Sequence, residues 1–152
     1  MEIYEAMAIQ ERWKNTRPIT VTTERAVACS AKIFSSDSRI LAAYLFGSRA
    51  RDGDHPESDI DLAFHADNSF TWNDYYLLWR SISKALHSDR FDLLWLDTAS
   101  PDIVFDVIKF GRHVFHRNDE TLNEFELYAK KRFWDYKIYL RKKIPEGARG
   151  RT

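Results

Sequence analysis

The chain holds a single cysteine, Cys29, among its 152 residues. One cysteine excludes an internal disulfide, and cysteine-poor chains are typical of reducing compartments. Long apolar runs are also missing, because none approaches the roughly 20 residues that a membrane-spanning helix needs. The opening stretch MEIYEAMAIQER has acids where a secretory signal peptide carries positive charge. We therefore expect a cytoplasmic protein that makes no membrane contact.

Glycine and proline are scarce, at five and four residues, and no low-complexity segment or repeat is visible. The 44% hydrophobic content indicates a packed globule rather than a disordered chain. Lys and Arg match Asp and Glu at 23 each, so no excess of positive charge points to direct nucleic-acid binding. The length fits one domain. We expect it over residues 1–143, with a helical extension over 1–20 and a mobile basic tail over 144–152.

Hydrophobic periodicity predicts strands interleaved with helices, which indicates an α/β (α+β) fold with helices packed against a small sheet. The expected elements are a helix over 22–34, a strand over 40–46, a connecting loop RARDGDHPE, a strand over 59–64, a helix capped by Thr71 and Asp74, a strand over 91–96, a helix from Ser100-Pro101 to Gly111, an edge strand RHVFH, and a final helix from about 120 to about 142.

Two aspartates flank one isoleucine in the second expected strand. Side chains alternate along a strand, so Asp59 and Asp61 project to one side while Ile60 and Leu62 anchor the other. Asp92 lies in the third expected strand, where an unpaired charge is costly. Carboxylate oxygens suit magnesium, which binds one or two carboxylates together with substrate phosphates. We interpret Asp59, Asp61 and Asp92 as ligands of two Mg²⁺ ions, with Asp92 placed to draw a proton from an attacking hydroxyl.

Gly47 and Ser48 directly follow the first expected strand. Glycine lets the backbone approach a ligand closely, and successive N–H groups with a serine hydroxyl can bind phosphate oxygens. Arg49 adjoins this turn, and its guanidinium matches phosphate geometry, so we expect it at the nucleotide. Arg51 fits phosphate and the acids of its own loop equally well.

The segment GSRARDGDHPESDIDL sets Gly47-Ser48 ten residues before Asp59-x-Asp61, between two apolar strands. It resembles the signature of the minimal nucleotidyltransferases, within the polymerase β-like nucleotidyltransferase superfamily. The resemblance implies a small, mixed, twisted sheet flanked by helices, with Gly47, Ser48 and Arg49 at a nucleotide triphosphate and the three aspartates at metal. One departure is visible: members commonly have glycine after the second arginine, where this chain has Asp52 and then Gly53.

Small members of that family often act as antitoxins encoded beside an all-helical HEPN ribonuclease toxin. They are thought to silence it by moving AMP from ATP to a toxin tyrosine. The resemblance thus implies a Mg²⁺-dependent protein adenylyltransferase in a hetero-oligomer with its toxin. Two alternatives stay open: a non-catalytic antitoxin that acts by occlusion, and a nucleotidyltransferase acting on an aminoglycoside-like small molecule or an RNA end. Length weighs against the second alternative, because the catalytic fold leaves no separate acceptor-binding domain.

Other histidines and aromatic residues have simpler interpretations. His113 and His116 would face opposite sides of a strand and make poor metal co-ligands. His65 belongs to no recognisable constellation, and Asp97 is expected to open a loop. The final helix alternates apolar and basic residues at helical period, which favours a partner interface over RNA binding. We expect core packing for four tryptophans, namely Trp72, Trp79, Trp95 and Trp134.

Overall fold

The computed structural model describes residues 21–52 and 59–144. The predicted N-terminal helix, most of the predicted loop after Asp52 and the basic tail lie outside these residues, and the domain limits stay a prediction. The elements are α2 (Thr23–Ser35), β1 (Ile40–Phe46), α3 (Ser48–Asp52), β2 (Ile60–Ala66), α4 (Trp72–Leu86), β3 (Phe91–Trp95), the short 3₁₀ helix η1 (Leu96–Thr98), α5 (Pro101–Phe110), β4 (Arg112–His116) and α6 (Asp119–Lys143).

The predicted α/β class is confirmed, and every helix and strand predicted within the described residues is present. Local chemistry explains the boundaries of α4, where Thr71 and Asp74 form a capping box. Pro101 begins α5. The predicted loop RARDGDHPE is wrong in its first part, because α3 covers Ser48–Asp52. The segment SRARD contains no glycine or proline to prevent a helical turn.

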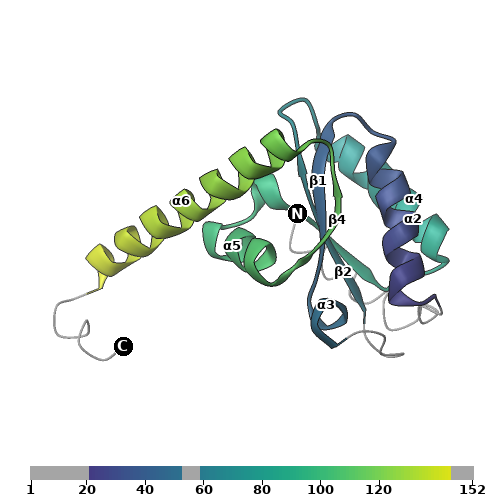
Figure 1. Cartoon of the computed structure of the whole chain (residues 1–152), viewed down its shortest axis with the longest axis horizontal. Helices are drawn as coiled ribbons and strands as arrows, with labels where there is room; N and C mark the ends of the chain where they lie inside the picture. Colours follow the sequence, from purple (N-terminus) through teal and green to yellow (C-terminus); the bar gives the residue numbers. More distant parts are fainter. Residues whose placement is uncertain (1–20, 53–58, 145–152) are drawn as a thin grey trace.

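The four strands form one mixed sheet in the order β3-β2-β1-β4, so β4 is the edge strand that the sequence predicts. β1 is antiparallel to both β2 and β4, whereas β2 and β3 run parallel. Helices α2 and α4 cover one face of the sheet, and α5 and α6 lie on the other (Figure 1). None of the helices within the described residues is long and apolar enough to cross a bilayer.

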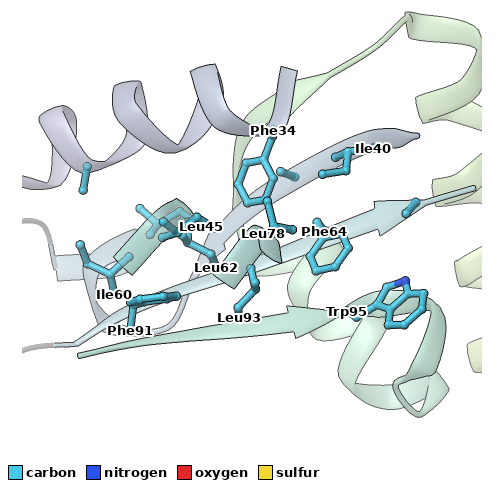
Figure 2. Packing of buried hydrophobic residues seen from close by; sticks show 14 of the residues in the cluster. Phe34, Ile40, Leu45, Ile60, Leu62, Phe64, Leu78, Phe91, Leu93 and Trp95 are labelled. Carbon is cyan, nitrogen blue, oxygen red and sulfur yellow. The ribbon is translucent and has the colours of Figure 1, made fainter. Parts of the chain in front are cut away.

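The larger core lies between the sheet and the α2/α4 layer (Figure 2). Phe34 of α2 and Leu78 of α4 reach toward the strands there, and Ile60 and Leu62 of β2 are fully buried as predicted. Burial of each such side chain contributes about 1.5–3 kcal/mol. Because strand residues alternate, filling this face with apolar side chains turns Asp61 of β2 to the opposite face.

The smaller core, on the α5/α6 face, includes Tyr44, Val104 and Val107. α6 contributes Ala129 as its one fully buried side chain, although the helix is 25 residues long. Its second half extends away from the sheet (Figure 1). The prediction of core packing is therefore wrong for Trp134, whose side chain is 61% exposed.

Two of the other tryptophans follow the prediction. Trp95 is buried among the aromatic rings of the larger core, and Trp79 stacks on Phe91 with ring centroids 5.2 Å apart. Trp72 differs, because it is the first residue of α4 and remains about half exposed. Its ring makes edge contacts with Trp95 and Tyr75, at 4.9 and 5.2 Å between centroids.

Candidate active site

Two of the three predicted carboxylates lie side by side on the sheet. The parallel register of β2 and β3 pairs Asp61 with Asp92, and the antiparallel register of β1 and β2 pairs Asp61 with Phe46. Residues paired across strands share a face, so both acids lie on the α5/α6 side of the sheet. The two carboxyl groups share a hydrogen bond. This contact holds a concentrated negative site at one end of the sheet.

Proximity of the two acids changes their protonation. Burial, followed by the hydrogen bond and charge of Asp61, raises the pKa of Asp92 to about 7. Asp92 remains exposed to solvent, and the atoms packed around its carboxyl group remove part of the hydration of that group. Burial also raises the pKa of Asp61, with the Asp59 charge adding to the rise and the hydrogen bond from Asp92 opposing it. Near pH 7 the pair therefore shares a proton, as expected of carboxyl groups that cannot both ionise cheaply.

The side chain of Asp59 pairs with Arg90 and not with the other two acids. Its Oδ1 accepts a hydrogen bond from Nε of Arg90 at 3.2 Å. Among the described residues no three histidine, cysteine, aspartate or glutamate side chains form a ready metal cluster. The donors nonetheless fit a hard cation, because Asp61 and Asp92 present carboxylate oxygens whose mutual repulsion a cation would relieve. Asp59 could join them only by leaving Arg90.

Gly47 touches the acid pair directly. Its backbone has a φ of +74°, a conformation that side chains disfavour. A Cβ placed on Gly47 would lie 2.0 Å from Oδ2 of Asp61, well inside contact distance. Two independent constraints, conformation and space, thus require glycine where β1 meets α3. The predicted close approach of backbone to a site is present, although the closest partner is the Asp61 carboxylate.

The other residues of the predicted phosphate turn are placed differently. Ser48 is half-buried and begins α3. Arg49 is 4% exposed, and its Nη1 lies 3.4 Å from the Val21 carbonyl oxygen and 3.5 Å from Thr23 Oγ1. In this conformation the guanidinium holds the start of α2, so a phosphate contact by Arg49 stays a prediction. The side chain of Arg51 lies outside the described residues.

A hollow of about 380 Å³ opens next to Gly47, within the usual size range of ligand pockets. Its wall combines the end of β1 with α5 and is mostly apolar, apart from one carboxylate. The lining residues are Phe46, Gly47, Ile103, Asp106, Val107 and Phe110. A larger hollow of about 610 Å³ lies against α4 between Leu77 and Lys84 and carries none of the predicted site residues. The hollow beside Gly47 is therefore the candidate ligand site.

The pairing of Arg90 with Asp59 was not predicted from the sequence. The available signal is the position of Arg90 two residues before Asp92, which puts it on the same side of an extended chain. Asp97 lies directly after β3, as predicted, but its hydrogen bonds to two strand ends were not predicted. Its carboxylate accepts hydrogen bonds from the Ala66 backbone N–H at 3.0 Å and from Trp95 Nε1 at 3.1 Å.

Three histidines connect the sheet to nearby acids. His65 Nδ1 lies 2.8 Å from Asp97 Oδ1, and the His65 ring stacks on Phe125 of α6 with centroids 4.0 Å apart. His113 Nε2 lies 2.8 Å from Glu126, and His116 Nε2 lies 2.8 Å from Asp119. These pairs join β2 and β4 to the first half of α6 and to η1.

Sequence comparison identifies the class of protein. Residues 30–120 match the family model described as "Polymerase beta, Nucleotidyltransferase". This match spans the strand pair, the Gly47 turn and all three aspartates. The chain therefore belongs to the polymerase β nucleotidyltransferase family, and it is a nucleotidyltransferase. No match was found among curated proteins.

Similar solved structures narrow the relationship. A toxin–antitoxin structure with AMP-PNP is 27% identical, with a TM-score of 0.59 over 74% of this chain and 86% of that chain. A mutant of the MntA-HpeT toxin–antitoxin, in which two aspartates are glutamates, is 26% identical, with a TM-score of 0.58 over 74% and 86%.

A third structure shares the fold at 24% identity, with a TM-score of 0.58 over 79% of this chain and 90% of that chain. It contains a tri-AMPylated HEPN toxin of Shewanella oneidensis in complex with an MNT antitoxin. Together with the family match, these structures confirm the predicted relationship to the minimal nucleotidyltransferases.

Proposed function

We propose that this nucleotidyltransferase is an antitoxin that moves AMP from ATP to a tyrosine hydroxyl of a HEPN-type toxin, with Mg²⁺ as cofactor. The observation that carries the proposal is the Asp61–Asp92 pair, which touches Gly47 at the edge of the hollow between β1 and α5. The relatives support the substrate and the partner, since one was solved with AMP-PNP and another holds an AMPylated toxin.

Asp61 and Asp92 would hold the metal, with Asp59 as a third ligand once it leaves Arg90. When bound, Mg²⁺ supplies charge neutralisation for the triphosphate and lowers the pKa of the attacking hydroxyl. The hydroxyl oxygen forms a new bond to the α-phosphorus, and the bond from that phosphorus to the bridging oxygen breaks. Pyrophosphate leaves, and the hydroxyl proton passes to a carboxylate oxygen of Asp92.

Residues outside the acid pair would bind and orient the nucleotide. The mostly apolar wall of Ile103, Val107 and Phe110 can accept the flat face of a base, and the Gly47 backbone lies where the phosphates must approach the acids. Phosphoryl-type transfer relies chiefly on positioning and charge stabilisation, so a rigid strand pair is a suitable support.

The test is incubation of the protein with ATP, Mg²⁺ and its cognate HEPN-type toxin, followed by intact mass measurement. We expect the toxin to gain the mass of one or more AMP groups. The double substitution Asp59→Asn/Asp61→Asn should abolish the gain and leave complex formation intact. Glu120→Gln/Glu124→Gln, which removes two exposed charges from α6, is the charge-matched control.

The same variants separate transfer from occlusion. If the Asp59→Asn/Asp61→Asn protein neutralises the toxin as well as the wild type does, the carboxylates are dispensable and the transfer mechanism is wrong. Where AMP transfer is observed, peptide mapping identifies the modified residue of the toxin. AMP on a residue other than tyrosine contradicts that part of the proposal.

A further inference from the structure

After Glu126, α6 exposes several large apolar side chains. We name residues 127–143 the α6 arm. Its end extends away from the sheet (Figure 1), and it carries large side chains that are between 38% and 70% exposed. They are Leu127, Tyr128, Trp134, Ile138, Tyr139 and Leu140. Exposure of this many large apolar side chains on one helix indicates an interaction site.

The arm is also strongly basic. Residues 127–143 include seven Lys or Arg and one acid, Asp135. The cations lie among the rings, since Lys137 Nζ is 5.5 Å from the Phe133 centroid and the Arg132 guanidinium carbon is 5.9 Å from that of Tyr128. The exposed surface is thus apolar and positive at once, and its complement is an apolar groove bordered by acids.

The arm is connected to the candidate active site through α5. Phe133 stacks flat on Phe105 of α5, with centroids 3.9 Å and planes 6° apart. α5 in turn lines the hollow beside Gly47, and two of its residues there, Ile103 and Phe110, are 45% and 61% exposed. In Figure 1, α5 lies between α6 and α3. A protein bound to the arm can extend over α5 to the acid pair.

We infer that the α6 arm is the docking surface for the acceptor protein of the proposed reaction, and that this acceptor presents an apolar groove bordered by Asp and Glu. The inference rests on the proposed function. An acceptor protein bound to the arm stays next to the candidate active site. Its hydroxyl group is then present there at a high effective concentration.

Two other occupants fit the surface less well. RNA binds through phosphates and base stacking, and the aliphatic Leu127, Ile138 and Leu140 offer neither. A second copy that paired arm against arm would bring two sets of basic residues together, which is destabilising. A protein groove satisfies both the aliphatic and the basic part of the arm.

The test uses the full chain and its purified cognate HEPN-type toxin. Trp134→Ala/Ile138→Ala should weaken the complex, measured by calorimetry, by at least about tenfold, since buried aromatic anchors dominate such interfaces. Tyr76→Ala/Leu77→Ala on α4 removes comparable exposed apolar surface from the opposite layer and should leave the affinity unchanged. Lys137→Glu should weaken toxin binding more strongly at low salt than at high salt, because salt screens the interaction between charges.

The readouts distinguish this inference from the proposed transfer. AMP-PNP binding by the Trp134→Ala/Ile138→Ala chain should equal that of the wild type, while KM for the toxin rises more than kcat falls. Docking is overturned if the arm variant binds the toxin as tightly as the wild type, or if the wild type does not bind it. It is also overturned if the substitution abolishes only self-association in sedimentation, or only binding of a poly(U) oligonucleotide. Complex formation without AMP transfer would refute the reaction and leave the docking surface in place.

Discussion

At the scale of single residues, the site depends on one missing side chain and one shared proton. Gly47 leaves the space that the Asp61 carboxylate fills, and Asp61 in turn hydrogen-bonds Asp92. A change at any of the three positions therefore reaches the other two. The geometry of the acid pair therefore depends on Gly47 as well as on the two acids.

Gly47→Ala tests this dependence. The new Cβ meets Asp61 Oδ2, and a left-handed conformation costs a non-glycine residue about 1–2 kcal/mol. We expect the free energy of unfolding in urea to fall by at least that amount and AMP transfer to fall more than about tenfold, because Asp61 must move. Ser48→Ala, one residue on, should leave the free energy of unfolding within about 0.5 kcal/mol. Full activity of Gly47→Ala would show that the contact is unimportant.

Arg90 would compete with a cation for Asp59 in the proposed mechanism. Removing the guanidinium in Arg90→Gln frees the Asp59 oxygen that accepts the Arg90 Nε–H at 3.2 Å. Because partly exposed ion pairs contribute about 0.2–1 kcal/mol, we expect Mn²⁺ to bind about 1.4- to fivefold more tightly. Mn²⁺ titration by electron paramagnetic resonance, without nucleotide, measures the change, and Arg80→Gln on the surface of α4 is the control. Weaker Mn²⁺ binding by Arg90→Gln would mean that Arg90 orients Asp59 for the metal.

The acids could be predicted from the sequence, but their contacts could not. Alternation along β2 is a local rule, so Asp61 and the buried Ile60 and Leu62 were assigned to the correct sides of the strand, whereas Asp59 lies just before it. The contact of Gly47 with Asp61 depends on how β1 and β2 pair, and the Asp61–Asp92 contact depends on the parallel register. Arg49 turns toward α2, where its guanidinium contacts the Val21 carbonyl oxygen, and no local sequence pattern predicts this contact. Registers and buried partners are properties of the assembled sheet.

At the scale of elements, the first half of α6 is attached to the sheet, and farther along Phe133 packs on α5. Tyr44 is fully buried in β1 and donates a hydrogen bond from its hydroxyl to Glu126 of α6 at 3.0 Å. Burial, together with the Glu126 charge, raises the pKa of this tyrosine, so it remains a donor. The capping, proline and periodicity signals that predicted the helices are local, whereas the attachment of α6 is not.

Tyr44→Phe removes the hydrogen bond between β1 and Glu126 of α6 without leaving a large cavity. Glu126 loses a neutral donor, and a hydrogen bond to a charged group contributes about 1.5–3 kcal/mol, so we expect a loss of that size in urea unfolding. His113 also contacts Glu126 and can offset part of the loss. His116→Gln, which removes only the exposed pair with Asp119, should change stability by less than about 0.5 kcal/mol. Equal effects of the two substitutions would contradict the proposed anchor.

At the scale of the whole molecule, the two faces of the sheet have different tasks. The α2/α4 face carries the larger apolar core, and the opposite face carries the acids at one end. Charge is divided too, since residues 126–152 hold nine basic and three acidic residues within a neutral chain. The larger apolar core and the acid pair thus lie on opposite faces of the sheet.

Stability should depend on pH through the acid pair. In metal-free protein the folded state raises the pKa of Asp92 from 3.8 to about 7, so between these values it holds more protons than the unfolded chain. The free energy of unfolding therefore decreases as pH rises through this window. Urea unfolding in EDTA at several pH values measures the slope. Asp92→Asn should reduce the slope, and Mg²⁺ should flatten it by favouring the charged form. A wild-type slope equal to that of Asp92→Asn would refute this coupling.

The placement of the acids away from the larger core has an evolutionary consequence. Substitutions that neutralise Asp61 or Asp92 remove repulsion from the sheet without opening the α2/α4 core. A lineage that loses the chemistry therefore keeps the fold, and it keeps whatever the α6 arm binds. Descendants of such a chain can persist as inhibitors that only bind, and an ancestral inhibitor can acquire transfer by changing a few residues at one end of one sheet.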